Sequence, residues 1–224
     1  MARAENHAIE PGTQRLLERM LFFSDGVFAI VLTLLVLELR LPPGIAEANL
    51  LRGVLDMEPE LAAFAITFAL VAVFWISHAT LTRRLTTFDW AVAWVNLLFL
   101  FTVTLTPFAS SLLGEYSVFG NAWRLYCMEL SAVGIAQLML FLVIYRDNGR
   151  LAGGASRREF WHRFTRASSP CLGFSILLAL SYMGFARLSF YLCWVMIPAI
   201  LLMARVTLGP RPESRLRRTN EDIQ

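Results

Sequence analysis

Long apolar stretches alternate with short polar segments along the whole chain. A helix that crosses a bilayer needs about 20 consecutive, mostly apolar residues, and six stretches meet that length. They lie near residues 17–40, 59–81, 90–113, 121–145, 168–187 and 189–207. The pattern therefore predicts an all-α integral membrane protein with one transmembrane domain at 17–207, an N-terminal segment at 1–16 and a basic tail at 208–224.

The composition agrees with this prediction. The chain is 57% hydrophobic and 17% charged, whereas soluble domains are about 45–50% apolar and about 25% charged. The first fifteen residues are polar, and the apolar stretch after them has no small-residue cleavage site, so we expect no removable signal peptide. Three cysteines fall inside predicted spans without a CxxC pair and are expected to be packing residues: Cys127, Cys171 and Cys193.

The arginines follow the predicted topology. All twenty basic residues are arginine. If the N-terminus is cytoplasmic, only four of them fall on the opposite side: Arg40, Arg52, Arg124 and Arg187. This satisfies the positive-inside rule and predicts an even number of spans with both termini in the cytoplasm. The topology also accounts for the pI of about 9.0, so we do not expect nucleic-acid binding.

The first span carries a stripe of small and β-branched residues. Gly26, Ile30, Thr33 and Leu37 fall within about 60° of one another on a helical wheel, and Leu34 flanks them. The stripe could pack against a neighbouring helix, with Gly26 allowing close approach. Alternatively, copies of the stripe could meet on a symmetry axis and line a pore. Both interpretations are open at this point.

An aspartate stands near the start of the same span. Asp25 costs roughly 2.5–3.5 kcal/mol at membrane depth, so it should have partners. Arg19 is six positions away and cannot pair with it as an i,i+4 couple. Candidate partners in other spans are His78, Trp94 and Asn96. We expect a polar cluster near the cytoplasmic end, formed by Arg19, Ser24, Asp25, His78 and Asn96, although His78 could instead cap the second span at the headgroup level.

Finer features are predicted further along the chain. The threonines and the proline at 104–107 should bend the third span. Glu129 lies in the middle of the fourth span on the same side as Gln137, which predicts an inter-helix hydrogen bond. The segment 146–167 should be the longest cytoplasmic connection, with Phe160–Phe164 as a short amphipathic helix at the membrane interface.

The head of the first span resembles a known signature. Arg19-xxx-Phe23-Ser24-Asp25, followed by GVFAIVLTLLVLEL, resembles the motif of the transmembrane protein 175 family of potassium channels, which occurs in lysosomes and in bacteria. The FWISH segment at Phe74–His78, the NLLFL segment at Asn96–Leu100 and the Pro107-Phe108 pair fit the same pattern. The resemblance covers at least residues 15–115.

The resemblance implies an architecture and a pore. Animal members are dimers with two six-helix repeats per chain, and bacterial members are tetramers with one repeat. This chain has one Phe-Ser-Asp motif, which implies a homotetramer in a bacterial plasma membrane. In the family the first helices line the pore, and an apolar ring about one turn beyond the motif forms the constriction. That ring corresponds to Ile30, with Thr33, Leu34 and Leu37 beyond it.

The function implied by the resemblance is passive conduction of potassium, without a cofactor and with membrane lipids as the surroundings. No TVGYG-like filter is present in the sequence. A secondary transporter that uses Asp25, His78 and Glu129 as a relay is one alternative, and a non-conducting membrane scaffold is another. We do not expect an enzyme or a metal site, because the sequence has no HExxH spacing, no GxSxG elbow and no glycine-rich phosphate loop.

Overall fold

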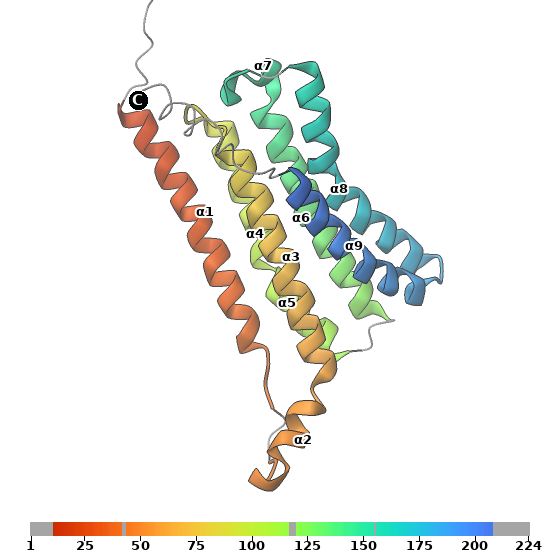
Figure 1. Cartoon of the computed structure of the whole chain (residues 1–224). Helices are drawn as coiled ribbons and strands as arrows, with labels where there is room; N and C mark the ends of the chain where they lie inside the picture. Colours follow the sequence, from red (N-terminus) through yellow and green to blue (C-terminus); the bar gives the residue numbers. More distant parts are fainter. Residues whose placement is uncertain (1–10, 42–43, 117–119, 155, 208–224) are drawn as a thin grey trace, which may run out of the picture.

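The protein is a bundle of long helices (Figure 1). The computed structural model describes residues 11–41, 44–116, 120–154 and 156–207, and these ranges contain helices and no strand. The helices are α1 (Pro11–Leu37), α2 (Leu50–Leu55), α3 (Glu58–Thr82), α4 (Trp90–Thr104), α5 (Thr106–Glu115), α6 (Asn121–Ile144), α7 (Arg146–Gly149), α8 (Arg157–Tyr182) and α9 (Ala186–Thr207), with short 3-10 turns at Glu47–Asn49 and Arg150–Ala152.

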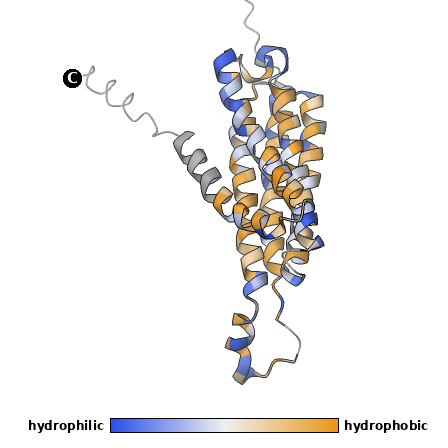
Figure 2. Ribbon diagram, turned by 90° about the vertical axis from the view of Figure 1, so that its right-hand side faces the viewer, coloured by the Kyte–Doolittle hydropathy of each residue, from blue (hydrophilic) through white to orange (hydrophobic). Residues whose placement is uncertain are grey.

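The long helices stand side by side, and α1 lies at one edge. It contacts α3, α4 and α5, whereas α6 packs between α4 and α8, and α9 packs on α8 and α3 (Figure 1). The short helix α2 projects beyond the bundle at one end, and α7 lies at the other (Figure 1). Hydrophobic residues cover the middle of the bundle and hydrophilic residues gather at its two ends (Figure 2).

Four helical segments of the described chain are long and apolar enough to cross a membrane: Gly12–Leu37, Glu58–Thr82, Trp90–Glu115 and Asn121–Ile144. They correspond to the first four predicted spans. The first half of α8 is rich in charged residues. In α9, the apolar part whose side chains the structure describes is Ala186–Met196, which is too short to cross a membrane by itself. The count of six spans therefore stays a prediction.

Two helix starts differ from the predicted boundaries. The first helix begins at Pro11, not at 17, which suits proline because the first turn of a helix needs no N–H donor. The longest cytoplasmic connection is predicted at 146–167, and its C-terminal bound is wrong, since α8 already begins at Arg157. The Ser156 hydroxyl accepts a hydrogen bond from the Glu159 N–H at 3.3 Å, as in a capping box. Phe160–Phe164 is accordingly part of α8 and not a separate interface helix.

A tight turn joins α6 to α8 at the arginine-rich end. Asp147 and Asn148 have φ values of 53° and 57°, a left-handed conformation that Asp and Asn tolerate better than most residues. The Thr86 N–H donates to the Leu151 carbonyl at 3.0 Å. Arg146 also pairs with Asp89 at 2.6 Å. The connections α3–α4 and α6–α8 are thus tied together at this end.

The third predicted span is interrupted as expected. Helix α4 ends at Thr104 and α5 begins at Thr106, because Pro107 has no N–H to continue the helical hydrogen bonds. The Thr104 hydroxyl donates to the Phe101 carbonyl at 2.7 Å, and the Leu105 N–H bonds the Thr102 carbonyl. The predicted kink at 104–107 is confirmed.

The core is mostly aliphatic, and aromatic rings are its bulkiest members. Its largest fully buried side chains include Phe28, Phe99, Trp123, Tyr126 and Phe174. Helices α6 and α8 approach closely at Gly134, where a Cβ would lie 2.7 Å from the Cys171 nitrogen. A glycine is required there because any side chain would force the two backbones apart.

Candidate functional site

One face of α1 packs against the bundle. Leu17, Ser24, Phe28, Val31 and Leu35 are buried and recur at a spacing of three, four or seven residues, which keeps them on one side of a helix. Phe28 contacts the rings of His78 on α3 and Phe99 on α4. This face fixes how α1 lies on its two neighbours.

The predicted stripe lies on an exposed part of α1. Gly26, Ile30, Thr33 and Leu37 are exposed, with Ile30 60% and Leu37 59% accessible. Within the described chain no helix covers them, so the described helices of the same subunit do not pack against this face. The Thr33 hydroxyl donates to the Ile30 carbonyl at 2.8 Å, which leaves the lone pairs of the hydroxyl oxygen available. The face is therefore open in the described part of the subunit.

A chain of hydrogen bonds connects α1, α3 and α4 inside the bundle. The Ser24 hydroxyl donates to the Met20 carbonyl at 2.9 Å, so its oxygen accepts from the Asn96 amide nitrogen, also at 2.9 Å. The Asn96 amide oxygen then faces His78 Nε2 at 2.8 Å. Because that oxygen can only accept, His78 donates through Nε2 and carries its proton there.

His78 is part of the protein interior. It is 1% exposed and stacks on Phe99 with ring centroids 5.3 Å apart and an interplanar angle of 7°. Its Nδ1 atom is buried without a hydrogen-bond partner among the described residues. The alternative that His78 only caps the second span at the headgroup level is therefore wrong. A hydrogen-bonded triad of Ser24, Asn96 and His78 instead connects three helices.

Asp25 has a partner that the sequence analysis missed. Its Oδ1 accepts a hydrogen bond from the Trp75 indole at 2.9 Å, on the surface between α1 and α3. Trp75 lies three residues before His78 in the FWISH segment, so one turn of helix brings both toward α1. The i,i+3 spacing of Trp75 and His78 was the feature of the sequence from which this contact could have been predicted.

Three residues of the motif and its predicted surroundings lie outside the cluster. Arg19 is exposed and forms no ion pair within the described part of the chain. Trp94 is 68% exposed on α4 and does not bond Asp25, because it points away from the α1 side that Asn96 faces. Phe23 of the motif is also exposed. The structure thus joins Ser24, Asn96 and His78, pairs Asp25 with Trp75, and leaves these three residues at the surface.

The other buried acid has a separate environment. The Thr106 hydroxyl of α5 donates to Glu129 Oε1 of α6 at 2.8 Å, which confirms an inter-helix hydrogen bond for Glu129. Gln137, on the same helix, has no hydrogen-bond partner among the described residues. Glu129, Asp25 and His78, the three groups of the possible relay, therefore bond three different partners. Among the described residues, no group of three His, Cys, Asp or Glu side chains could hold a metal ion.

Several known proteins are similar to this chain. The sequence model of a family described as "Endosomal/lysosomal potassium channel TMEM175" matches residues 19–107, which include the stripe and the Ser24–Asn96–His78 chain. A relative from Chamaesiphon minutus, named a potassium channel, is 36% identical over 143 residues, or 61% of this chain and 70% of the relative. One from Streptomyces collinus, also named a potassium channel, is 29% identical over 123 residues, or 55% of this chain and 60% of the relative.

Similarity extends to an animal protein and to a solved structure. The rat endosomal/lysosomal proton channel TMEM175 is 30% identical over 132 residues, which cover 58% of this chain but 26% of the rat protein. The crystal structure of a lysosomal potassium-selective channel TMEM175 homolog from Chamaesiphon minutus superposes with a TM-score of 0.72 at 28% identity, covering 85% of this chain and 98% of the other. The chain spans less than two thirds of the Streptomyces relative and about a quarter of the rat one. The sequence resemblance is confirmed, and the chain belongs to the TMEM175 family.

Proposed function

We propose that this protein is a subunit of a potassium-permeable cation channel that conducts passively across a bacterial plasma membrane. The observation that carries the proposal is the bare stripe on α1, where Ile30 and Leu37 are about 60% exposed on a helix long enough to span a bilayer. Family membership supports it, because two bacterial relatives are named potassium channels. The channel needs no cofactor and catalyses no reaction, and potassium is its permeant ion.

The stripe becomes a pore wall when four copies meet on an axis. A ring of apolar side chains at Ile30 would form the constriction, with rings of Thr33, Leu34 and Leu37 in the turns beyond it. Such a constriction controls conduction by narrowing and dewetting, and it excludes ions that hold their hydration shell more strongly than potassium does. The Thr33 hydroxyl donates its proton to the Ile30 carbonyl, so its oxygen is free to face a partly dehydrated cation.

The Ser24–Asn96–His78 chain then acts as an anchor and not as an ion site. It is buried between α1, α3 and α4 and fixes the rotation of α1, which determines the side chains that reach the axis. The Asp25–Trp75 bond is exposed at the edge of the same contact, where a neighbouring subunit would sit. Four subunits are supported by the single Phe-Ser-Asp motif in this chain.

The proposed orientation has six spans, with both termini in the cytoplasm. Arg15, Arg19 and the arginines of α7 and α8 lie at the same end of the bundle as Arg83 and Arg84, which follow α3. The described arginines at the other end are Arg40, Arg52, Arg124 and Arg187. This asymmetry supports a cytoplasmic location for the α7 end.

A potassium flux assay in liposomes tests the proposal. We expect downhill potassium flux through the purified full chain and a severalfold larger flux through Ile30→Asn, because a polar ring at the constriction favours wetting. Ile176→Asn is the matched control, since Ile176 on α8 is 58% exposed and lies far from the stripe in the sequence. Equal increases in potassium flux in both variants would argue that the constriction does not lie on α1.

The same assay separates the alternatives. No potassium flux through intact tetramers of either protein would contradict the channel proposal and favour a non-conducting scaffold. Flux that saturates or requires a countersubstrate would instead favour a transporter. Chemical cross-linking of the purified protein, which we expect to stop at four copies, checks the subunit number independently.

A further inference from the structure

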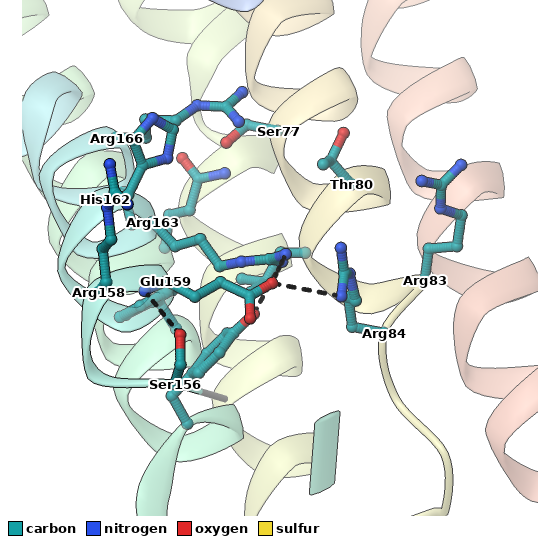
Figure 3. Close-up of a pocket in the computed structure, with 15 residues that line it drawn as sticks. Ser77, Thr80, Arg83, Arg84, Ser156, Arg158, Glu159, His162, Arg163 and Arg166 are labelled. Carbon is teal, nitrogen blue, oxygen red and sulfur yellow. Dashed lines mark hydrogen bonds and ion pairs between the residues drawn. The ribbon is translucent and has the colours of Figure 1, made fainter. Parts of the chain in front are cut away.

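A cavity of about 630 Å³ opens at the arginine-rich end of the bundle, on the opposite side of α3 from α1 (Figure 3). Residues from α3, α6 and α8 and from the connections next to them line it. It is distinct from the stripe on α1, and none of the residues assigned to the proposed pore contributes to it.

The cavity has more positive than negative charge. Five arginines line it, Arg83, Arg84, Arg158, Arg163 and Arg166, with a single carboxylate at Glu159. Glu159 Oε1 lies 2.6 Å from Arg163 Nη2 and 3.7 Å from Arg84 Nη1, and Figure 3 shows both guanidinium groups turned toward it. In the described part of the chain, the other three arginines have no carboxylate within ion-pair distance.

One of the five arginines, Arg163, is held in place before any ligand is bound. Arg163 also donates to the Tyr145 hydroxyl at 2.9 Å, so two bonds orient its guanidinium. Burial and the neighbouring Arg163 both lower the pKa of Arg166 from its ordinary value, the direction expected where cations are crowded together. An anion in the cavity would relieve this repulsion.

A buried amide faces the same space without a partner. Gln137 lines the cavity and is 1% exposed, yet neither its amide nitrogen nor its amide oxygen has a hydrogen-bond partner among the described residues. A buried amide without partners costs about 1–3 kcal/mol. A ligand in the cavity that accepts a hydrogen bond would remove this penalty.

We propose that the cavity binds the phosphate group of an anionic ligand. Arginine guanidinium groups match phosphate oxygens in two-point hydrogen bonds, and the Gln137 amide nitrogen supplies a further donor. The phosphate could belong to a lipid headgroup or to a soluble compound. Leu81, Phe141 and Ala167 line the same cavity and offer an apolar surface for the glycerol and acyl carbons of a lipid. The site does not depend on ion conduction through α1.

Thermal unfolding of the purified full chain in detergent tests the site. We expect phosphatidylglycerol to raise the Tm by about 2–4 °C relative to the same concentration of zwitterionic phosphatidylcholine. A parallel series uses inorganic phosphate against chloride at matched ionic strength. A rise with phosphatidylglycerol alone identifies the lipid source, whereas a rise with both probes shows that the phosphate group itself is recognised.

Variants locate the binding site. The double variant Arg158→Gln and Arg166→Gln should lose most of the ligand-dependent rise. Arg157→Gln is the matched control, because Arg157 is the exposed neighbour of Arg158 on α8 and does not line the cavity. Gln137→Leu removes the unpaired amide, so it should leave the Tm without ligand unchanged or higher while it reduces the ligand-dependent rise.

Two results would overturn the proposal. One is the absence of a Tm rise with either probe. The other is a ligand-dependent Tm rise that persists in the double variant or that Arg157→Gln reduces to the same extent. Such a rise would reflect general attraction of anions to the arginine-rich end. Size-exclusion profiles that match the unmodified protein show that the variants remain folded.

Discussion

The two faces of α1 are both apolar in sequence, but one is buried against the bundle and the other is exposed. Phe28, Val31 and Leu35 are 1% exposed, whereas Ile30 and Leu37, on the same turns, are about 60% exposed. A helix that is apolar all round is normally buried all round. Hydropathy alone therefore does not distinguish the two faces of α1, and the exposed one is the face that we propose lines the pore.

The largest expected effect tests the buried face. Phe28→Ala should lower the free energy of unfolding by about 3–5 kcal/mol, because Phe28 fills the contact between α1, His78 and Phe99. Phe22→Ala on the same helix is the control, since Phe22 is 84% exposed. Denaturant titration in detergent measures both. Equal losses would mean that the two faces are equally packed.

The polar anchor comes next. Asn96→Ala should cost about 2 kcal/mol, because it leaves the Ser24 oxygen and His78 Nε2 buried without their partner. Asn121→Ala removes an exposed amide at the start of α6 and should change stability by less than about 0.5 kcal/mol. The same titration compares them. If both variants are equally stable, the anchor does not hold α1.

A smaller effect is expected at the edge of the two faces. Trp75→Phe removes the donor to Asp25 and should cost about 1 kcal/mol, with a lower fraction of assembled tetramer in cross-linking. Trp94→Phe is the control, as Trp94 is exposed and makes no hydrogen bond in the described chain. Asp25→Ala should likewise reduce assembly more than it changes ion preference. Intact Asp25→Ala tetramers with altered ion selectivity would instead mean that Asp25 acts on the permeating ion and not on assembly.

The smallest effect concerns the exposed face alone. Thr33→Val keeps the shape of the side chain and removes the hydroxyl, so we expect about a twofold change in potassium-over-sodium preference with little change in flux. Thr104→Val is matched in chemistry, because both hydroxyls donate to the carbonyl three residues earlier. Reversal potentials in planar bilayers measure the preference. The same shift in both variants would argue against a role for the Thr33 oxygen.

Much of the fold could be predicted from local patterns. The first four spans and the break at 104–107 follow from apolar length and from proline. The start of α8 was missed because its first turns are polar, and hydropathy does not detect a polar helix that packs at the end of a bundle. The N-cap at Ser156, whose hydroxyl accepts from the Glu159 N–H, was a local signal that hydropathy does not include.

The candidate site was predicted in part. Ser24, His78 and Asn96 could be grouped because each is a polar residue at a similar depth in an apolar helix, and such groups need partners. Trp75 was missed because an indole is mostly apolar and one N–H decides its role. The basic cavity was missed since its residues come from three helices whose ends are far apart in sequence.

The membrane class, the segregation of arginines and the family motif can be read from the amino-acid sequence, because each depends on residue type and spacing along one chain. The three-dimensional arrangement was needed to learn which face of α1 is buried, which residue bonds Asp25, and that five arginines and Gln137 line one cavity. The physical reason is that hydropathy belongs to single residues, whereas burial and hydrogen bonding depend on the shape and the donors of neighbouring helices.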